Sequence, residues 1–169
     1  MSGKLIILGS GPIVSEITFS EIVSNQFSQI IVFTENKKNI FPREDFSSIS
    51  ASRVLICPLE NIHDFKFTKD DVLVVAWRFL DSLDSQKIRI IHKIADIRNE
   101  CLCFYLSSVS VYGEAEYPVN EKTILKPINI YGKRKQESED IFLKLFSTRS
   151  TNLRLSNIYG NPFFDDLIN

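Results

Sequence analysis

The strongest constraint on the fold is a regular alternation of short apolar runs with longer amphipathic patterns. Runs that are apolar along most of their length indicate strands buried on both faces, as in a parallel sheet covered by helices. The β-α-β order therefore predicts an α/β fold, a doubly wound parallel sheet with helices on both faces. The six runs are Leu5–Leu8, Ile30–Phe33, Val54–Cys57, Val72–Ala76, Leu102–Leu106 and Leu153–Ile158.

Helical periodicity fills three of the gaps between these runs. A first helix is expected after Pro12, because proline suits the first turn of a helix and apolar residues follow at helical spacing. The polar segment 37–53 predicts no regular element. Gly113–Pro127 predicts one long loop, and such loops are often functional. The apolar positions of the three predicted helices are Ile13, Ile17, Ile22 and Val23; Ile88, Ile91, Ile94 and Ala95; and Ile141, Leu143, Leu145 and Phe146.

Composition limits the classes of protein that fit. The 169 residues, 44% of them hydrophobic, predict a single soluble domain over residues 1–169. Lys and Arg total 20 against 21 Asp and Glu, so the overall charge favours neither a nucleic acid nor a membrane surface as partner. Cys57, Cys101 and Cys103 have no metal-binding spacing with His63 or His92. We therefore expect reduced thiols, no metal site and a cytoplasmic protein.

The first apolar run leads into a glycine turn, Gly9-Ser10-Gly11-Pro12-Ile13. In a doubly wound sheet, such a turn lets a pyrophosphate approach backbone N–H groups at the start of the next helix. We therefore expect these five residues to bind a dinucleotide cofactor, although an ordinary strand-to-helix turn also uses two glycines. Val14 stands at the third glycine position of the G-x-G-x-x-G pattern. This departure predicts a helix pushed outward or a reshaped phosphate loop.

Charged residues after the second run bear on the choice of cofactor. Glu35 is placed to hydrogen-bond the adenosine ribose hydroxyls, which favours NAD. Lys37 or Lys38 would instead suit the 2′-phosphate of NADP, and a solvated charged turn would equally account for all three side chains. We prefer NAD bound through Glu35 and leave NADP open.

A serine, a tyrosine and a lysine form the most specific pattern in the chain. Ser107 and Ser108 stand at the end of the fifth run, and Tyr131 and Lys135 are spaced to share one face of a helix. The Lys135 ammonium favours the phenolate form of Tyr131. Such a tyrosine exchanges a proton at a sugar hydroxyl or carbonyl while a hydride moves to or from nicotinamide, and Ser108 would hydrogen-bond the same oxygen. A Y-x-x-x-K pair alone is usually a surface pair on a helix.

These residues belong to a longer ordered signature. Together they resemble the extended short-chain dehydrogenases, the NAD-dependent epimerase/dehydratase family acting on nucleotide sugars. The resemblance is strong over residues 102–162 and weaker before them, and it implies a Rossmann domain that binds NAD or NADP. The signature comprises Ser107-Ser108-x-x-Val111-Tyr112-Gly113, Glu121, Pro127, Tyr131-Gly-x-x-Lys135, Glu139 and Leu153-Arg154-x-x-Asn157-x-Tyr159-Gly160.

The resemblance implies roles for individual residues. Ser108, Tyr131 and Lys135 match the catalytic set, and Lys135 also matches the lysine that holds the nicotinamide ribose. Asn157 matches a position that commonly touches substrate, as Ser108 would. Ser107, beside the catalytic serine, is expected at the cofactor.

Five further residues belong to the resemblance without matching the catalytic set. Ala76 and Trp77 follow the fourth run, where the family places small residues, and we expect both at the cofactor. A buried structural aromatic is the alternative for Trp77. Tyr112 either packs or functions, and Arg154 and Glu139 are expected to be structural.

The activity implied is that of an NAD(P)-dependent nucleotide-sugar epimerase or reductase, by family analogy in polysaccharide synthesis and as a homodimer. Relatives that dehydrate carry Asp-Glu directly after the catalytic hydroxyl, and Val109-Ser110 stands there instead. Relatives are longer and close a carboxyl-terminal lobe over the nucleotide sugar, and we expect that lobe to be absent here. The alternative function is a non-catalytic NAD(P)-binding sensor or interaction module.

Overall fold

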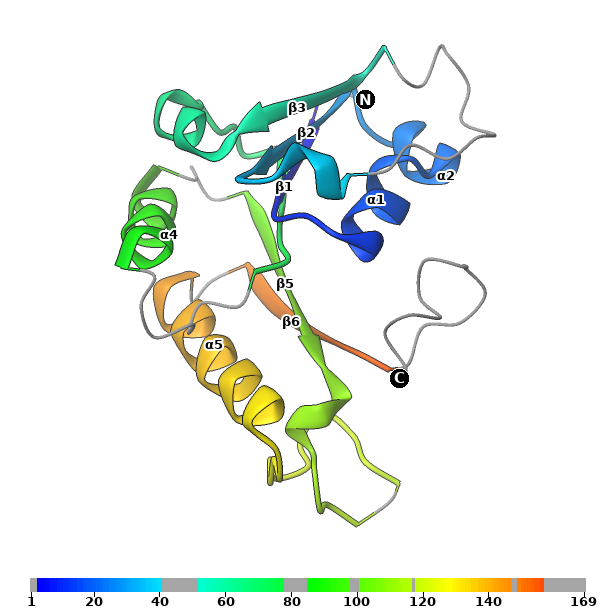
Figure 1. The fold of residues 1–169 in the computed structure, drawn as a ribbon, viewed down its shortest axis with the longest axis vertical. Coiled ribbons are helices and arrows are strands. Elements are labelled where there is room, and N and C mark those ends of the chain that lie inside the picture. The colour runs from blue at the N-terminus through cyan, green and yellow to red at the C-terminus, as the bar shows by residue number, and fades with distance from the viewer. Residues whose placement is uncertain are drawn as a thin grey trace.

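The computed structural model describes residues 3–40, 52–77, 85–97, 101–116, 118–146 and 149–156. Within them, parallel strands form one six-stranded sheet in the order β3-β2-β1-β4-β5-β6 (Figure 1). The strands are β1 (Lys4–Leu8), β2 (Gln29–Thr34), β3 (Val54–Pro58), β4 (Val72–Val75), β5 (Leu102–Ser108) and β6 (Ser150–Leu155). The helices are α1 (Pro12–Thr18), α2 (Glu21–Ser24), α4 (Ser85–Ile97) and α5 (Ile130–Phe146), with 3-10 turns η1 (Lys37–Asn39), η2 (Leu59–Asp64) and η3 (Val109–Val111).

The sheet confirms the predicted doubly wound α/β fold. Strands β2 and β3 lie on one side of β1, and β4, β5 and β6 lie on the other, so the direction of winding reverses between β1 and β4. At such a reversal the loops after the two strands diverge and leave a crevice at their carboxyl ends. The loops after β1 and β4 therefore border the crevice in which this fold binds ligands.

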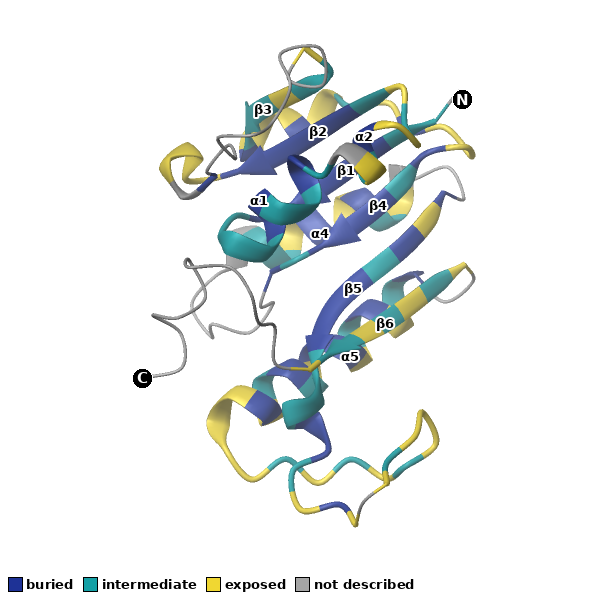
Figure 2. Cartoon of the chain, turned by 90° about the vertical axis from the view of Figure 1, so that its right-hand side faces the viewer, coloured by how far each residue is buried: buried dark blue, intermediate teal, exposed yellow. Residues whose placement is uncertain are grey.

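Two apolar cores lie on opposite faces of the sheet. Figure 1 shows α1 and α2 on one face and α4 and α5 on the other. The face of α4 and α5 includes Ile91, Tyr105 and Phe142, all fully buried, whereas Val14 of α1 packs with residues of β1 and β2 on the opposite face. Figure 2 shows that β1 and β2 are largely buried, while the edge strand β6 is half-buried or exposed. The crevice therefore lies at the ends of well-buried central strands.

The first predicted helix is broken in two. Helix α1 ends where the Phe19 N–H donates to the Ser15 carbonyl at 2.9 Å, and α2 begins two residues later. The Ser20 hydroxyl accepts from the Val23 N–H at 3.4 Å, so a serine caps the second piece and restarts the helix. The apolar spacing of Ile13, Ile17 and Ile22 predicted one helix because periodicity does not report this local side-chain competition.

The last predicted run is displaced along the sequence. Strand β6 begins at Ser150, three residues before the predicted start, and its residues alternate in burial rather than forming a continuous apolar run. It pairs with β5 from Cys103↔Ser150 to Ser108↔Leu155, and as an edge strand it needs an apolar residue only at alternate positions. Of the rest of the predicted run, Ser156 lies outside the strand and 157–158 lie outside the described residues.

Helices α4 and α5 confirm the other two helical predictions, and the described parts of Gly113–Pro127 contain no helix or strand, as expected. This loop is nevertheless ordered: Gly113 has a φ of 53°, and the Glu114 N–H donates to the Lys126 carbonyl at 3.2 Å. Cys101 and Cys103 are buried and Cys57 is half-buried, and none of the three forms a disulfide. None of the helices that the structure describes is long and apolar enough to cross a membrane.

Candidate active site

A pocket of about 410 Å³ opens at the carboxyl ends of β1, β4, β5 and β6. It brings the glycine turn against the serine, tyrosine and lysine, which lie about a hundred residues later in the chain. Lys135 is the one charged side chain among the described residues that line it, so the lining favours an anionic ligand. The lining residues are Ser10, Gly11, Pro12, Ile13, Val14, Ala76, Leu106, Ser107, Ser108, Tyr131, Lys135, Leu155 and Ser156.

The glycine turn forms one wall of this pocket from main chain and small side chains. Gly9 and Gly11 have φ values of 133° and 108°, which L side chains rarely adopt. A Cβ at Gly9 would lie 3.1 Å from Ala76 Cβ and 3.3 Å from Trp77 Cδ1, so this glycine backs onto the loop after β4. A Cβ at Gly11 would meet nothing within 4 Å. The backbone at Gly11 thus borders open space in which a ligand can approach closely.

Val14 keeps α1 on the sheet although the usual glycine is missing. Its side chain is 1% exposed and packs in the same core as Leu5, Ile7 and Val32. Val14 also lines the pocket, so its extra bulk lies between the sheet and the space for a ligand. Val14 therefore belongs both to the core and to the lining of the pocket.

Two serines at the end of β5 form the pocket floor. Ser107 is 4% exposed, and its Oγ is buried with no hydrogen-bond partner among the described residues. An unsatisfied buried hydroxyl is costly, and this one belongs to a residue that lines the pocket. The Ser108 Oγ accepts from the Ser110 N–H at 3.2 Å and lies 2.9 Å from the Ser110 Oγ. Both hydroxyls lie where the resemblance placed them.

Helix α5 supplies the tyrosine and the lysine from its first turns. Asn129 caps this helix, because its side chain accepts from the Gly132 N–H at 2.7 Å and its carbonyl accepts from the Lys133 N–H at 3.1 Å. Tyr131 is 40% exposed at the pocket rim, while Lys135 is 5% exposed. The predicted spacing therefore places both residues at one site.

The Lys135 ammonium is buried beneath the pocket. Its Nζ donates to the Leu106 carbonyl at 2.6 Å and lies 4.8 Å from the centre of the Tyr105 ring. The carbonyl oxygen and the ring face both favour the charged amine, which offsets part of the cost of removing it from water. The lysine is thus held between β5 and α5 with its ammonium still charged.

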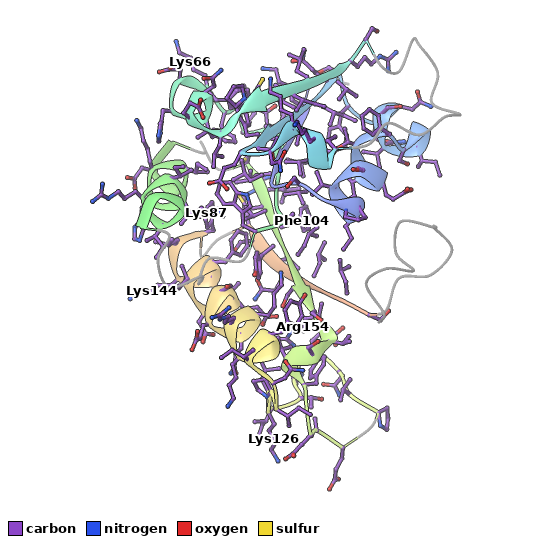
Figure 3. All side chains as sticks on the ribbon, in the orientation of Figure 1. Lys66, Lys87, Phe104, Lys126, Lys144 and Arg154 are labelled. Carbon is purple, nitrogen blue, oxygen red and sulfur yellow. The ribbon has the colours of Figure 1, made fainter. Side chains whose placement is uncertain are left out.

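A polar network around Arg154, which is labelled in Figure 3, joins β6 to α5. Arg154 of β6 donates from Nε and Nη2 to the Glu139 carboxylate at 3.0 Å and 2.9 Å, and from Nη1 to the Tyr112 hydroxyl at 2.9 Å. Tyr112 in turn donates to the Asn120 carbonyl at 3.1 Å. The hydrogen bonds to Glu139 raise the pKa of Arg154 above its already high value, with smaller contributions from Tyr112. The expected structural roles of Arg154 and Glu139 are confirmed, and Tyr112 joins them.

Three of the predicted site residues do not line the pocket. Gly9 lies behind the turn, and Trp77 is 7% exposed within the core beside α4. Glu35 is half exposed after β2 and pairs with Lys87 of α4 at 3.4 Å, while Lys37 and Lys38 are exposed in η1. Asn157, the predicted substrate contact, lies outside the described residues.

Four lining residues were not predicted from the sequence. Val14, Leu106, Leu155 and Ser156 complete the pocket beside the predicted set. The register supplies the reason for two of them, because Leu106 directly precedes the two serines and Leu155 pairs with Ser108 across the parallel strands. Leu155 could have been predicted from the register between β5 and β6. That register was missed because the last strand was expected to begin at Leu153 rather than at Ser150.

Comparison with known proteins agrees with the geometry. The sequence profile of the NAD dependent epimerase/dehydratase family matches residues 67–166. Similar solved structures include ADP-L-glycero-D-manno-heptose-6-epimerase from Helicobacter pylori, with a TM-score of 0.65, 18% identity, and coverage of 96% of this chain and 58% of that one. UDP-glucuronic acid 4-epimerase from Bacillus cereus in complex with NAD matches with a TM-score of 0.61 and 19% identity. The match covers 92% of this chain and 58% of that one. UDP-glucose 4-epimerase from Brucella ovis in complex with NAD matches with a TM-score of 0.60 and 15% identity, over 92% of this chain and 52% of that one.

These structural likenesses establish the fold, and the profile establishes the family. No curated protein matches the sequence at a significant level. The chain spans a little over half the length of the solved chains that it matches. The profile match includes the segment from β4 to β6 and begins after the glycine turn.

Proposed function

The chain belongs to the NAD dependent epimerase/dehydratase family, and we propose that its pocket binds NAD and acts on a sugar carried by a nucleotide. The proposed reaction is an epimerisation or a keto reduction that uses Ser108, Tyr131 and Lys135. The observation that carries this proposal is the convergence of the glycine turn with these three side chains around one pocket. Two solved structures with the same fold are epimerases in complex with NAD.

The residues of the pocket suit a dinucleotide. The open space at Gly11 admits a phosphate close to the backbone, and the Lys135 ammonium gives the lining a positive charge. The buried Ser107 hydroxyl has no protein partner in the described chain and would gain one from the ligand. Glu35 and Ala76 would border the adenosine half, since they follow β2 and β4 on either side of β1. These features favour NAD, with NADP as the other dinucleotide that the exposed Lys37 and Lys38 would suit.

The proton chemistry falls to Tyr131 and Ser108. When bound, NAD supplies the acceptor and, in the reverse step, the donor of a hydride. As the C–H bond of the sugar carbinol breaks, the Tyr131 oxygen takes the hydroxyl proton and the carbinol becomes a ketone. Ser108 donates a hydrogen bond to the same oxygen and keeps it in line. In the reverse step Tyr131 would return the proton to the ketone oxygen as the other face of the carbonyl is reduced, which would give the epimer.

Lys135 supports this exchange electrostatically. Its ammonium lines the same pocket as Tyr131, and its hydrogen bond to the Leu106 carbonyl at 2.6 Å fixes its position. Dehydration is not part of the proposal, because Val109 and Ser110 follow Ser108 where an acid/base pair would be needed. The reaction class is therefore limited to hydride and proton exchange at one carbon.

The alternative function is an NAD-binding sensor or interaction module without turnover. The observation that favours it is the position of Lys135, whose ammonium is engaged by the Leu106 carbonyl and the Tyr105 ring beneath the pocket. A binding module needs the pocket and its charge but no proton transfer. The two functions therefore differ in what the Tyr131 hydroxyl does.

Substitution Tyr131→Phe separates the two functions. Wild-type protein and variant are each incubated with NAD and UDP-glucose or UDP-N-acetylglucosamine, and the sugars are followed by NMR while NAD affinity is measured by calorimetry. The proposal predicts turnover by the wild type and a loss of at least about a hundredfold in the variant, with NAD affinity kept. Equal turnover in both proteins would contradict the assigned role of Tyr131. NAD binding without turnover on any nucleotide sugar tried would favour the sensor.

A further inference from the structure

We propose that Ser110 is a positioning residue that turns the Ser108 hydroxyl toward the pocket and fixes it relative to Tyr131. This inference rests on the proposed function for its catalytic meaning. Ser110 is not among the described residues that line the pocket, and it is half-buried in η3, immediately behind Ser108. It would therefore act on a ligand only through its neighbours.

The first support is a pair of hydrogen bonds between the two serines. The Ser110 N–H donates to the Ser108 Oγ at 3.2 Å, and the two Oγ atoms lie 2.9 Å apart. Ser108 has an extended backbone, with φ −145° and ψ 148°, and its side chain caps the η3 turn. Both contacts hold the Ser108 oxygen in place, and the contact between the two hydroxyls adds a proton that can point either way.

The direction of that second hydrogen bond decides what Ser108 offers to a ligand. A hydroxyl oxygen has one proton and two acceptor positions, and the Ser110 N–H already uses one acceptor position of Ser108. If the Ser110 hydroxyl donates, it uses the other, and Ser108 can only donate its own proton into the pocket. A sugar carbonyl or alkoxide oxygen requires a donor of this kind. We therefore assign the Ser110 hydroxyl as the donor whenever such an oxygen is bound.

The second support is independent of the side chain and concerns the main chain of Ser110. A Cβ at Gly132 would lie 2.5 Å from the Ser110 carbonyl oxygen and 3.0 Å from Pro127 Cβ. The first turn of α5 therefore rests directly against the Ser110 backbone, and Gly132 is the residue next to Tyr131. One residue thus contacts both halves of the site, Ser108 through its N–H and hydroxyl and the Tyr131 helix through its carbonyl.

The test uses the rotamer of Ser108, which does not depend on turnover. Three-bond couplings from the Ser108 Hβ protons to the backbone nitrogen and carbonyl carbon are measured by NMR in the wild type, Ser110→Ala, Ser110→Thr and Ser28→Ala. Ser28→Ala is the matched control, because the Ser28 hydroxyl donates to the Gly3 carbonyl at the opposite end of the sheet. We expect one Ser108 rotamer in the wild type, the Thr variant and the control, and averaged couplings in Ser110→Ala. A single unchanged rotamer in Ser110→Ala would overturn the proposal.

Turnover gives the second readout. With the nucleotide sugar that the wild type converts, Ser110→Ala should lower kcat by about two- to tenfold with KM and NAD affinity nearly unchanged, since one hydrogen bond to Ser108 is lost. Ser110→Thr should restore kcat. Gly132→Ala should also lower kcat, because α5 or η3 must move, while the Ser108 rotamer stays fixed. An unchanged kcat in Ser110→Ala would show that the orientation has no catalytic effect and would overturn the positioning role.

The two readouts separate this inference from the proposed function. If the wild type neither binds NAD nor converts a sugar, the proposed function fails, and averaged Ser108 couplings in Ser110→Ala would still support orientation of Ser108 by Ser110. If the wild type turns over and Ser110→Ala matches it in both readouts, only the inference about Ser110 fails.

Discussion

One wall of the pocket is formed mainly by main chain, and the other is formed mainly by side chains. The wall after β1 consists of main chain and small side chains, and its shape comes from two glycines with positive φ. The wall from β5 and α5 consists of side chains, each held by others: Ser108 by Ser110, Lys135 by the Leu106 carbonyl, and the helix itself by Asn129. The shape of the first wall depends on glycines, which lack a side chain, whereas the second wall depends on the functional groups of its side chains.

The two walls also differ in what they require of the sequence. A main-chain wall needs only the conformation that glycine allows, so Val14 is accommodated by packing into the core below it. A side-chain wall needs specific groups at fixed spacing, together with the residues that hold them. The family profile matches residues 67–166, which include the side-chain wall but not the glycine turn. Substitutions in the two walls should therefore have different consequences.

We expect the largest loss of stability from a substitution that removes the ion pair supporting α5 in the side-chain wall. Arg154→Met leaves the Glu139 carboxylate, whose side chain is 3% exposed, without its charged partner. Removing one member of a buried ion pair is strongly destabilising, so we expect the free energy of unfolding to fall by about 3 kcal/mol. Urea denaturation of the variant and of the wild type measures this loss. A loss below about 1 kcal/mol would mean that water replaces the arginine and that the network does not hold α5.

A smaller and different effect is expected in the main-chain wall. Gly11→Ala meets no steric obstacle, because its Cβ would have nothing within 4 Å, but it must adopt a φ of 108°. We expect a destabilisation of about 1–2 kcal/mol and an NAD affinity lower by about tenfold or more, because the methyl group enters the space for the ligand. Calorimetric titration and urea denaturation of the same preparation give both values. Unchanged NAD affinity would place the phosphates elsewhere.

The smallest effect is expected at the ion pair outside both walls. Lys87→Met breaks the contact to Glu35, which is 49% exposed, at 3.4 Å. Exposed pairs contribute little, so the free energy of unfolding should change by less than about 0.5 kcal/mol. The variant therefore serves as the control for Arg154→Met in the same urea experiment. A loss as large as that of Arg154→Met would contradict the contrast drawn here between exposed and buried charge.

The sequence predicted the fold because the apolar runs of a buried parallel sheet are continuous and visible. The predictions from apolar periodicity were wrong at an edge strand and at a helix break that depends on one side chain. Strand β6 alternates because it is an edge strand, so its start at Ser150 was missed, and the break after α1 depends on the Ser20 hydroxyl. Both features are decided by neighbours in space or by a single side chain, which apolar periodicity does not report.

The candidate site could be predicted in its side chains but not in their supports. Tyr131 and Lys135 were identified from their spacing, and Ser107 and Ser108 from their place at the end of the fifth run and from the family resemblance. The structure places all four at one pocket. The contact between Ser110 and Ser108 was missed, although a serine two residues after another at the end of a strand is a known turn-forming pattern. The pairing of Arg154 with Tyr112 joins residues 42 apart and had no signal in the sequence beyond the two residues themselves.

The central claim is that the two walls together bind NAD, and one titration tests it most directly. Trp77 is the single tryptophan of the chain, and it lies buried against the back of the glycine turn at Gly9. Its fluorescence is followed while NAD is added, with NADP as the comparison and calorimetry as the independent check. The account predicts a saturable change with micromolar affinity and a preference for NAD. Absence of binding by both methods would contradict it.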